Sequence, residues 1–79
     1  MYNHVMEHVT AGKVYEHYKG GSYLVLHIVD ESTNALVGRK GVVYVSLTHG
    51  LVKHRDLEEF IEIVEWPDGQ QRPRFVIKS

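Results

Sequence analysis

The chain has 79 residues, 43% of them hydrophobic, and a formal net charge of −1 from nine basic and ten acidic side chains. This length and composition predict one folded domain and exclude both a disordered chain and two lobes around a deep cleft. The near-zero charge argues against non-specific nucleic-acid binding, which rewards a strongly basic surface.

The chain contains no cysteine, which excludes disulfides, zinc–thiolate sites and a cysteine nucleophile. No stretch approaches the roughly 20 apolar residues of a membrane span, and the first residues lack the basic-then-apolar pattern of a signal peptide. We therefore expect a cytoplasmic protein with no membrane association. Residues 1–11 are expected to form a tail or a short helix, and residues 12–79 a single small β domain.

The first half of the domain alternates apolar and polar residues, which predicts strands over 13–18, 23–30 and 41–48. In the second of these, Leu24, Leu26 and Ile28 are expected on one face, and Tyr23, Val25, His27 and Val29 on the other. The paired glycines at 20 and 21 predict a tight hairpin turn. Residues 31–34 are short and polar, which predicts a loop, and residues 35–40 are ambiguous.

The second half contains shorter elements. Residues 51–55 predict a short strand, and Asp56 with Glu59 has capping-box spacing, which predicts a single helical or 3₁₀ turn. A strand is expected over 60–66, followed by a turn at Pro67-Asp68-Gly69. A final strand is expected over 71–78, with Pro73 restricting it to an edge of the sheet.

These elements predict an all-β fold, namely a small SH3-like, partly open barrel of five to six strands with one short helical or 3₁₀ turn. The helical turn comes one strand earlier than is common in SH3-like barrels. An OB-fold is the second choice, because it usually has a longer chain and a helix between its third and fourth strands.

The opening segment, Gly12-Lys13-Val14-Tyr15-Glu16-His17-Tyr18-Lys19-Gly20, resembles the start of the DUF1653 family of small bacterial and phage domains, whose function is unknown. The resemblance continues through Tyr23-Leu24-Val25-Leu26, Val42-Val43-Tyr44, the set Arg55, Leu57 and Phe60, and Pro73-Arg74-Phe75. It departs at residues 29–34 and at Lys53-His54-Arg55-Asp56, where the family tends to have a tryptophan and a proline. Those departures put in doubt any family site built from these two segments.

Several aromatic and basic residues are candidates for binding a ligand. Tyr15, His17, Tyr18 and Lys19 could stack a ring and contact a phosphate, although tyrosines in small barrels are mostly core. Arg39 and Arg55 would join a local basic patch with Lys40, Lys53 and His54 if their strands pair, against the alternative of salt-bridged solvent faces. Arg74 suits an anion by its fork geometry, against the alternative that it pairs with a glutamate.

We expect no cofactor, no metal and no enzymatic activity. His4 and His8 have i, i+4 spacing, but a zinc site needs further ligands, and the other histidines are scattered. No nucleophile elbow, phosphate-binding loop or dinucleotide fingerprint is present, and a domain this small supplies poorly the water-excluding site that catalysis needs.

Three functions remain open. The first is a non-enzymatic interaction module that acts on a protein partner or forms a homo-oligomer, for example a phage or mobile-element protein acting on its host. The second is a binder or sponge for a small nucleotide-like anion at an oligomer interface. The third is a barrel that binds nucleic acid weakly, which the charge balance disfavours.

Overall fold

The structure, a computed structural model, describes residues 9–31 and 39–78, and the predicted helix of the N-terminal segment lies largely outside these ranges. Seven strands and one short helix occur there, namely β1 (Val14–His17), β2 (Ser22–Glu31), β3 (Arg39–Ser46), β4 (Val52–Asp56), α2 (Leu57–Phe60), β5 (Ile63–Glu65), β6 (Gln71–Pro73) and β7 (Phe75–Ile77). None of the described residues forms a helix long and apolar enough to cross a membrane.

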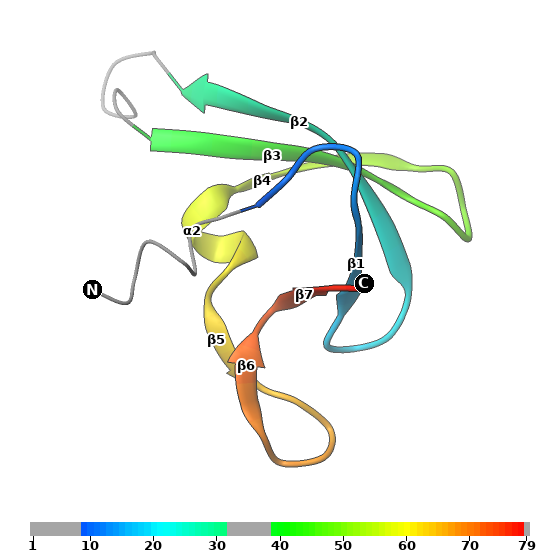
Figure 1. The fold of residues 1–79 in the computed structure, drawn as a ribbon, viewed down its shortest axis with the longest axis vertical. Coiled ribbons are helices and arrows are strands. Elements are labelled where there is room, and N and C mark those ends of the chain that lie inside the picture. The colour runs from blue at the N-terminus through cyan, green and yellow to red at the C-terminus, as the bar shows by residue number, and fades with distance from the viewer. Residues whose placement is uncertain (1–8, 32–38, 79) are drawn as a thin grey trace.

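The strands form two antiparallel sheets, one of five strands in the order β4-β3-β2-β1-β7 and one consisting of the β5–β6 hairpin. The larger sheet curls without closing (Figure 1). After β4, which is one edge of this sheet, the chain continues into α2 and then into the β5–β6 hairpin. The prediction of an all-β, partly open barrel with one helical turn is confirmed. The described strands number seven, rather than five or six.

Glycines make the β1–β2 hairpin. Gly20 and Gly21 have φ angles of 102° and 96°, a region that other residues rarely adopt. The turn is closed by the Gly20 amide, which donates to the His17 carbonyl at 2.8 Å, and by the His17 amide, which donates to the Gly21 carbonyl at 3.1 Å. The turn therefore fixes the conformation of the segment from His17, the last residue of β1, to Lys19.

The predicted division of β2 into two faces is wrong beyond Val25. A β-bulge shifts the register with β3 between Val25 and His27, so that Val25 lies opposite Tyr44 but Ile28 lies opposite Val42. The extra residue changes the alternation, because two residues of β2 then oppose one of β3. Ile28 consequently packs against the core on the same side as Val25, and His27 is exposed. β2 also extends to Glu31, one residue into the predicted loop.

The predicted cap of α2 is confirmed in part. The Asp56 carboxylate accepts a hydrogen bond from the Glu58 amide at 3.1 Å, which satisfies one of the free amides of the helix start. The helix presents a single fully buried residue, Phe60, to the core. Phe60 was predicted to begin the next strand, which instead begins at Ile63.

The predicted last strand is two strands that belong to different sheets. Pro73 in β6 lies opposite Ile63 in β5, whereas Phe75 in β7 lies opposite His17 in β1. Arg74 joins the two sheets, because its amide donates to the Glu62 carbonyl at 2.7 Å and its carbonyl accepts from the Tyr18 amide at 3.0 Å. The chain thus pairs with β5 before Arg74 and with β1 after it.

The core lies on the concave side of the larger sheet and is mostly aromatic. Its buried members are Tyr15, Val25, Val42, Tyr44, Phe60 and Phe75. Phe60 and Phe75 stack in parallel with ring centroids 4.0 Å apart, and Tyr44 meets both rings edge-on. Aromatic rings bury much area per residue, which suits a domain too small for a large aliphatic core.

Candidate ligand-binding face

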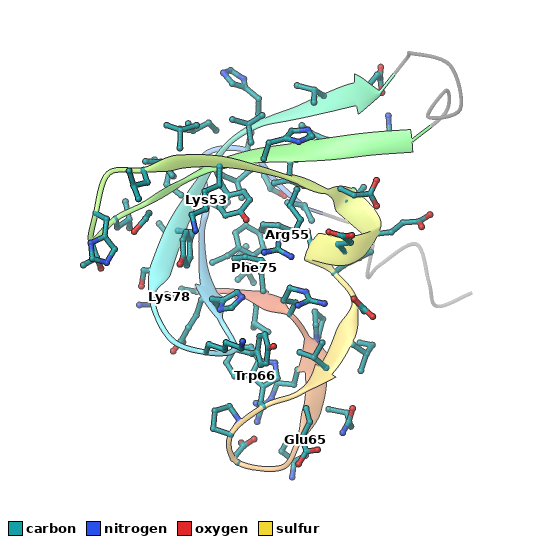
Figure 2. The ribbon with its side chains drawn as sticks, turned by 180° about the vertical axis from the view of Figure 1, so that it is seen from behind. Lys53, Arg55, Glu65, Trp66, Phe75 and Lys78 are labelled. Carbon is teal, nitrogen blue, oxygen red and sulfur yellow. The ribbon has the colours of Figure 1, made fainter. Side chains whose placement is uncertain are left out.

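A group of cations and rings gathers on the concave side of the sheet beside the core. We define the basic–aromatic face by His17, Tyr18, Lys19, Lys53, Arg55 and Arg74. Lys53 lies opposite Tyr44 and Arg55 opposite Val42 in the β3–β4 ladder, so both share the inward face of the sheet. In Figure 2, Lys53, Arg55 and Phe75 lie within the curve of the sheet.

His17 is the centre of this face. Its ring centroid lies 4.7 Å from that of Phe75, 4.9 Å from that of Tyr18 and 6.0 Å from that of Tyr23. The Lys19 amide donates to His17 Nδ1 at 3.2 Å, which the imidazole accepts only with Nδ1 unprotonated. The ring is therefore held between aromatic neighbours as a neutral group.

The surroundings of His17 are strongly positive. Burial lowers the pKa of His17 from 6.5 to about 4, and the charges of four neighbouring cations contribute to the same shift. In decreasing order of effect these cations are Arg55, Arg74, Lys19 and Lys53. The imidazole is therefore uncharged at neutral pH, and the net field on this face attracts anions.

The two arginines are held in place by specific contacts. Arg55 Nε donates to the Tyr44 hydroxyl at 3.2 Å, and its guanidinium lies 5.8 Å from the centroid of Phe75. Arg74 Nε donates to the Glu59 carbonyl at 2.9 Å, and its Nη2 is 2.6 Å from Glu62 Oε1. The predicted alternative, that Arg74 pairs with a glutamate, is thus realised. These contacts orient both side chains and leave part of each guanidinium exposed.

The two lysines differ from the arginines because, within residues 9–31 and 39–78, no carboxylate lies at ion-pair distance from either. Both residues are exposed. Lys19 Nζ lies 5.7 Å from the centroid of Tyr18, a ring that also has the Arg74 guanidinium at 5.8 Å. Among the described residues of this face, Lys19 and Lys53 are therefore the charges that a ligand could neutralise without breaking an ion pair.

Two of the predicted site residues are not on this face. Tyr15 is buried in the core, where its hydroxyl accepts from the Thr10 amide at 2.9 Å. Arg39 begins β3, beyond the end of the β3–β4 pairing at Gly41, so the register separates it from Arg55. Its neighbour Lys40 pairs with Asp30 at 2.7 Å, and His54 lies on the opposite face of β4 from Arg55.

The sequence analysis named Lys53 only as a member of a possible basic patch, and it did not name Tyr23 or Phe75 as candidates for the site. Lys53 and Arg55 are two residues apart in a strand and therefore share a face, a signal that was available in the sequence. Tyr23 and Phe75 reach His17 through the pairing of β1 with both β2 and β7. The Pro73-Arg74-Phe75 segment gave no indication that its chain would change sheets.

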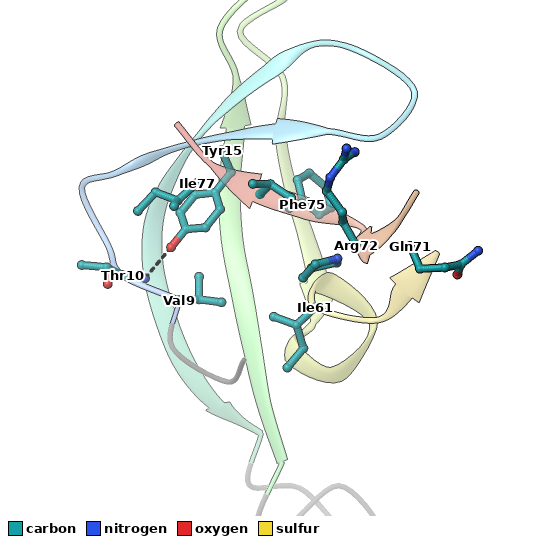
Figure 3. Close-up of a pocket in the computed structure, with 10 residues that line it drawn as sticks. Val9, Thr10, Tyr15, Ile61, Gln71, Arg72, Phe75 and Ile77 are labelled. Atoms are coloured by element: carbon teal, nitrogen blue, oxygen red, sulfur yellow. Dashed lines mark hydrogen bonds between the residues drawn. The ribbon is translucent and has the colours of Figure 1, made fainter. Parts of the chain in front are cut away.

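Besides the basic–aromatic face, Phe75 also borders a hollow. This hollow, the β7 pocket, has a volume of about 520 Å³ (Figure 3). Its lining is mostly apolar, with Thr10, Gln71 and Arg72 as polar members beside Val9, Tyr15, Ile61, Pro73, Phe75, Val76 and Ile77. A smaller concavity of about 440 Å³ is lined by Asp56, Glu58, Glu59 and Glu62.

Among the described residues no group of three histidine, aspartate or glutamate side chains could hold a metal ion. The predicted pair His4 and His8 lies outside those residues.

Comparison with known proteins places the chain in a family. The family model described as "Protein of unknown function (DUF1653)" matches residues 13–77. A crystal structure of a DUF1653 protein from Bordetella bronchiseptica has 34% sequence identity and a TM-score of 0.68, and the match covers 90% of this chain and 88% of that one. No curated protein matches. The resemblance seen in the sequence is therefore confirmed, and the chain belongs to the DUF1653 family.

Proposed function

We propose that this domain is a non-enzymatic binding module and that its basic–aromatic face holds a small anionic ligand with a planar ring, of the nucleotide type. One observation carries the proposal: His17 is packed between the rings of Tyr18 and Phe75, and three cations lie over these two rings, namely Lys19 and Arg74 over Tyr18 and Arg55 over Phe75. Lysine and arginine attract a phosphate, and partly exposed rings provide a surface on which a base can stack.

The chemistry of the face favours binding over catalysis. A general base for neutral pH needs a pKa close to 7, whereas burial and cations lower the pKa of His17 to about 4. The arginines are engaged by Glu59, Glu62 and Tyr44, which gives them fixed directions. A preorganised set of donors of this kind lowers the entropy lost when a ligand binds.

Binding of a nucleoside monophosphate to the ¹⁵N-labelled 79-residue chain tests the proposal. AMP is expected to cause saturable chemical-shift changes at residues 17–19 and 53–55, with adenosine and inorganic phosphate each binding more weakly than AMP. Lys53→Gln should weaken AMP binding several-fold because it removes an unpaired cation. Lys13→Gln is the matched control, because Lys13 is exposed and is not among the cations that act on His17.

Three results would contradict the proposal. AMP could cause no saturable change at millimolar concentration, it could shift residues away from the face, or Lys53→Gln and Lys13→Gln could bind it equally. A single-stranded oligonucleotide in parallel separates the nucleic-acid alternative, which would show a steep loss of affinity with salt.

A protein partner is a second candidate. The observation that favours it is the β7 pocket, which is mostly apolar and open and borders an edge strand of the sheet. Concave apolar surfaces beside a strand edge suit extended peptides.

A further inference from the structure

The imidazole of His17 uses one of its two nitrogens within the protein and leaves the other unused. The Lys19 amide donates to Nδ1, so the neutral ring carries its proton on Nε2. Within residues 9–31 and 39–78, nothing forms a hydrogen bond with Nε2, and no buried side-chain nitrogen or oxygen is left without a partner. The Nε2–H group is therefore a hydrogen-bond donor that is accessible from outside the protein.

The direction of this donor is fixed by the packing of the ring. His17 lies opposite Phe75 in the β1–β7 ladder, and the two rings are tilted by 60° to each other. Tyr18 is tilted by 52° against the imidazole on another side, and Tyr23 meets it edge-on. A side chain held by three rings has little rotamer freedom to lose when a ligand binds, so its donor is preorganised.

The donor lies where an anion is attracted. Three cations lie over the rings that flank His17, namely Lys19 and Arg74 over Tyr18 and Arg55 over Phe75. The same positive charges contribute to the low pKa of the imidazole, which shows that their field reaches this ring. A hydrogen bond from a neutral N–H group to a charged oxygen is stronger than one to a neutral acceptor. An anionic oxygen is therefore the acceptor that suits Nε2–H best.

We propose that His17 is a specificity-determining residue of the face, because its Nε2–H donates to a terminal oxygen of a phosphate monoester. The inference rests on the proposed function and names the chemical group that the same face recognises. A phosphate monoester has three terminal oxygens, so one can accept from His17 while the others meet the lysines. Lysines attract any anion, whereas a donor with a fixed direction requires an acceptor at one position.

Two substitutions separate the donor from the rest of the side chain. His17→Asn keeps a short side-chain oxygen that can accept from the Lys19 amide, but it has no donor at the position of Nε2. His17→Gln has a longer side chain, whose amide nitrogen reaches close to that position and donates. Both variants lose the ring and its aromatic contacts, so the difference between them isolates the donor.

Titration of the ¹⁵N-labelled 79-residue chain with AMP and with adenosine tests the inference. We expect His17→Asn to weaken AMP binding by about tenfold and to change adenosine binding by less than about twofold, because only AMP has the phosphate. His17→Gln should bind AMP within about threefold of the unsubstituted chain. Amide spectra recorded without ligand verify that each variant folds.

A measurement on the unsubstituted chain does not depend on the variants. Long-range ¹H–¹⁵N spectra of the imidazole distinguish a protonated ring nitrogen from an unprotonated one. We expect the proton on Nε2 both without and with AMP, and AMP should shift the Nε2 resonance more than that of Nδ1. If a variant does not fold, this spectrum decides the question alone.

Four results would overturn the role of His17. His17→Asn could weaken AMP and adenosine equally, which is the effect of a structural residue. The two variants could lose AMP binding to the same extent, which would assign the effect to the ring. The proton could be found on Nδ1, or AMP could leave Nε2 unshifted while it saturates the face. The last result leaves the anion site standing, whereas a lack of AMP binding by the unsubstituted chain overturns the proposed function itself.

Discussion

The basic–aromatic face and the β7 pocket both contact Phe75, yet they differ in chemistry and in what they leave open. The face consists of rings and of two kinds of cation: arginines whose directions are fixed by contacts, such as Arg55 with Tyr44 and Arg74 with Glu62, and the exposed lysines Lys19 and Lys53. The pocket has mostly aliphatic and aromatic walls, with Thr10, Gln71 and Arg72 as its polar members, and it borders β7, an edge strand of the sheet. One small aromatic core thus supports two surfaces suited to different ligands, one by charge and the other by shape.

Substitution of Phe75, the residue shared by both regions, should have the largest effect. Phe75→Ala removes a ring stacked on Phe60 and buried to 3% exposure, so we expect it to destabilise the fold by about 3 to 5 kcal/mol. Urea denaturation measures this, with Phe75→Leu as a milder control because leucine leaves a smaller cavity. A loss below about 1 kcal/mol for Phe75→Ala would contradict a shared core beneath the two surfaces.

Gly21→Ala should affect the face more than the pocket. Gly21 has a φ of 96°, and an added Cβ would lie 3.3 Å from Tyr23 Cε1. We expect a loss of about 1 to 2 kcal/mol in the free energy of unfolding. Amide shifts should concentrate at residues 17–23 and spare Ile61 and Ile77. Equal perturbation of the β7 pocket would show that the two regions are not separable.

The stability of the domain should depend on pH through His17. Its pKa of about 4 in the folded state lies below its ordinary 6.5, so the unfolded chain binds more protons between these values. Stability is therefore retained above pH 6.5 and falls as pH decreases toward 4. Urea midpoints across this range measure the effect, and His17→Gln should flatten the profile. An equally steep profile in His17→Gln would assign the dependence to another group.

The smallest expected effect is on the pKa of His17 itself, and it concerns the face alone. Lys53→Gln removes one of the positive charges that lower this pKa, so the imidazole should titrate at a higher pH. NMR titration of the His17 ring measures the change. Because Lys53 is the weakest of the four cations acting on His17, Arg55→Gln should raise the pKa further. The reverse order would contradict the arrangement of charges on this face.

The sequence by itself determined most of the strands and turns. Alternation located β1, β2 and β3 to within a few residues, the glycines located the hairpin, and Asp56 located the start of α2. These signals are local, since they depend on residue period, positive φ and side-chain capping. They also brought five of the seven candidate residues, namely His17, Tyr18, Lys19, Arg55 and Arg74, into consideration before their positions were known.

Only the tertiary structure decided which of those residues meet. The bulge after Val25 changes the faces of β2, and the change of sheet at Arg74 brings Phe75 and Arg74 beside His17 and Tyr18. The ends of the β3–β4 ladder separate Arg39 from Arg55, and burial in the core removes Tyr15 from the face. Strand pairing joins residues far apart in the chain, so its register depends on the packing of the whole core, which no local pattern contains.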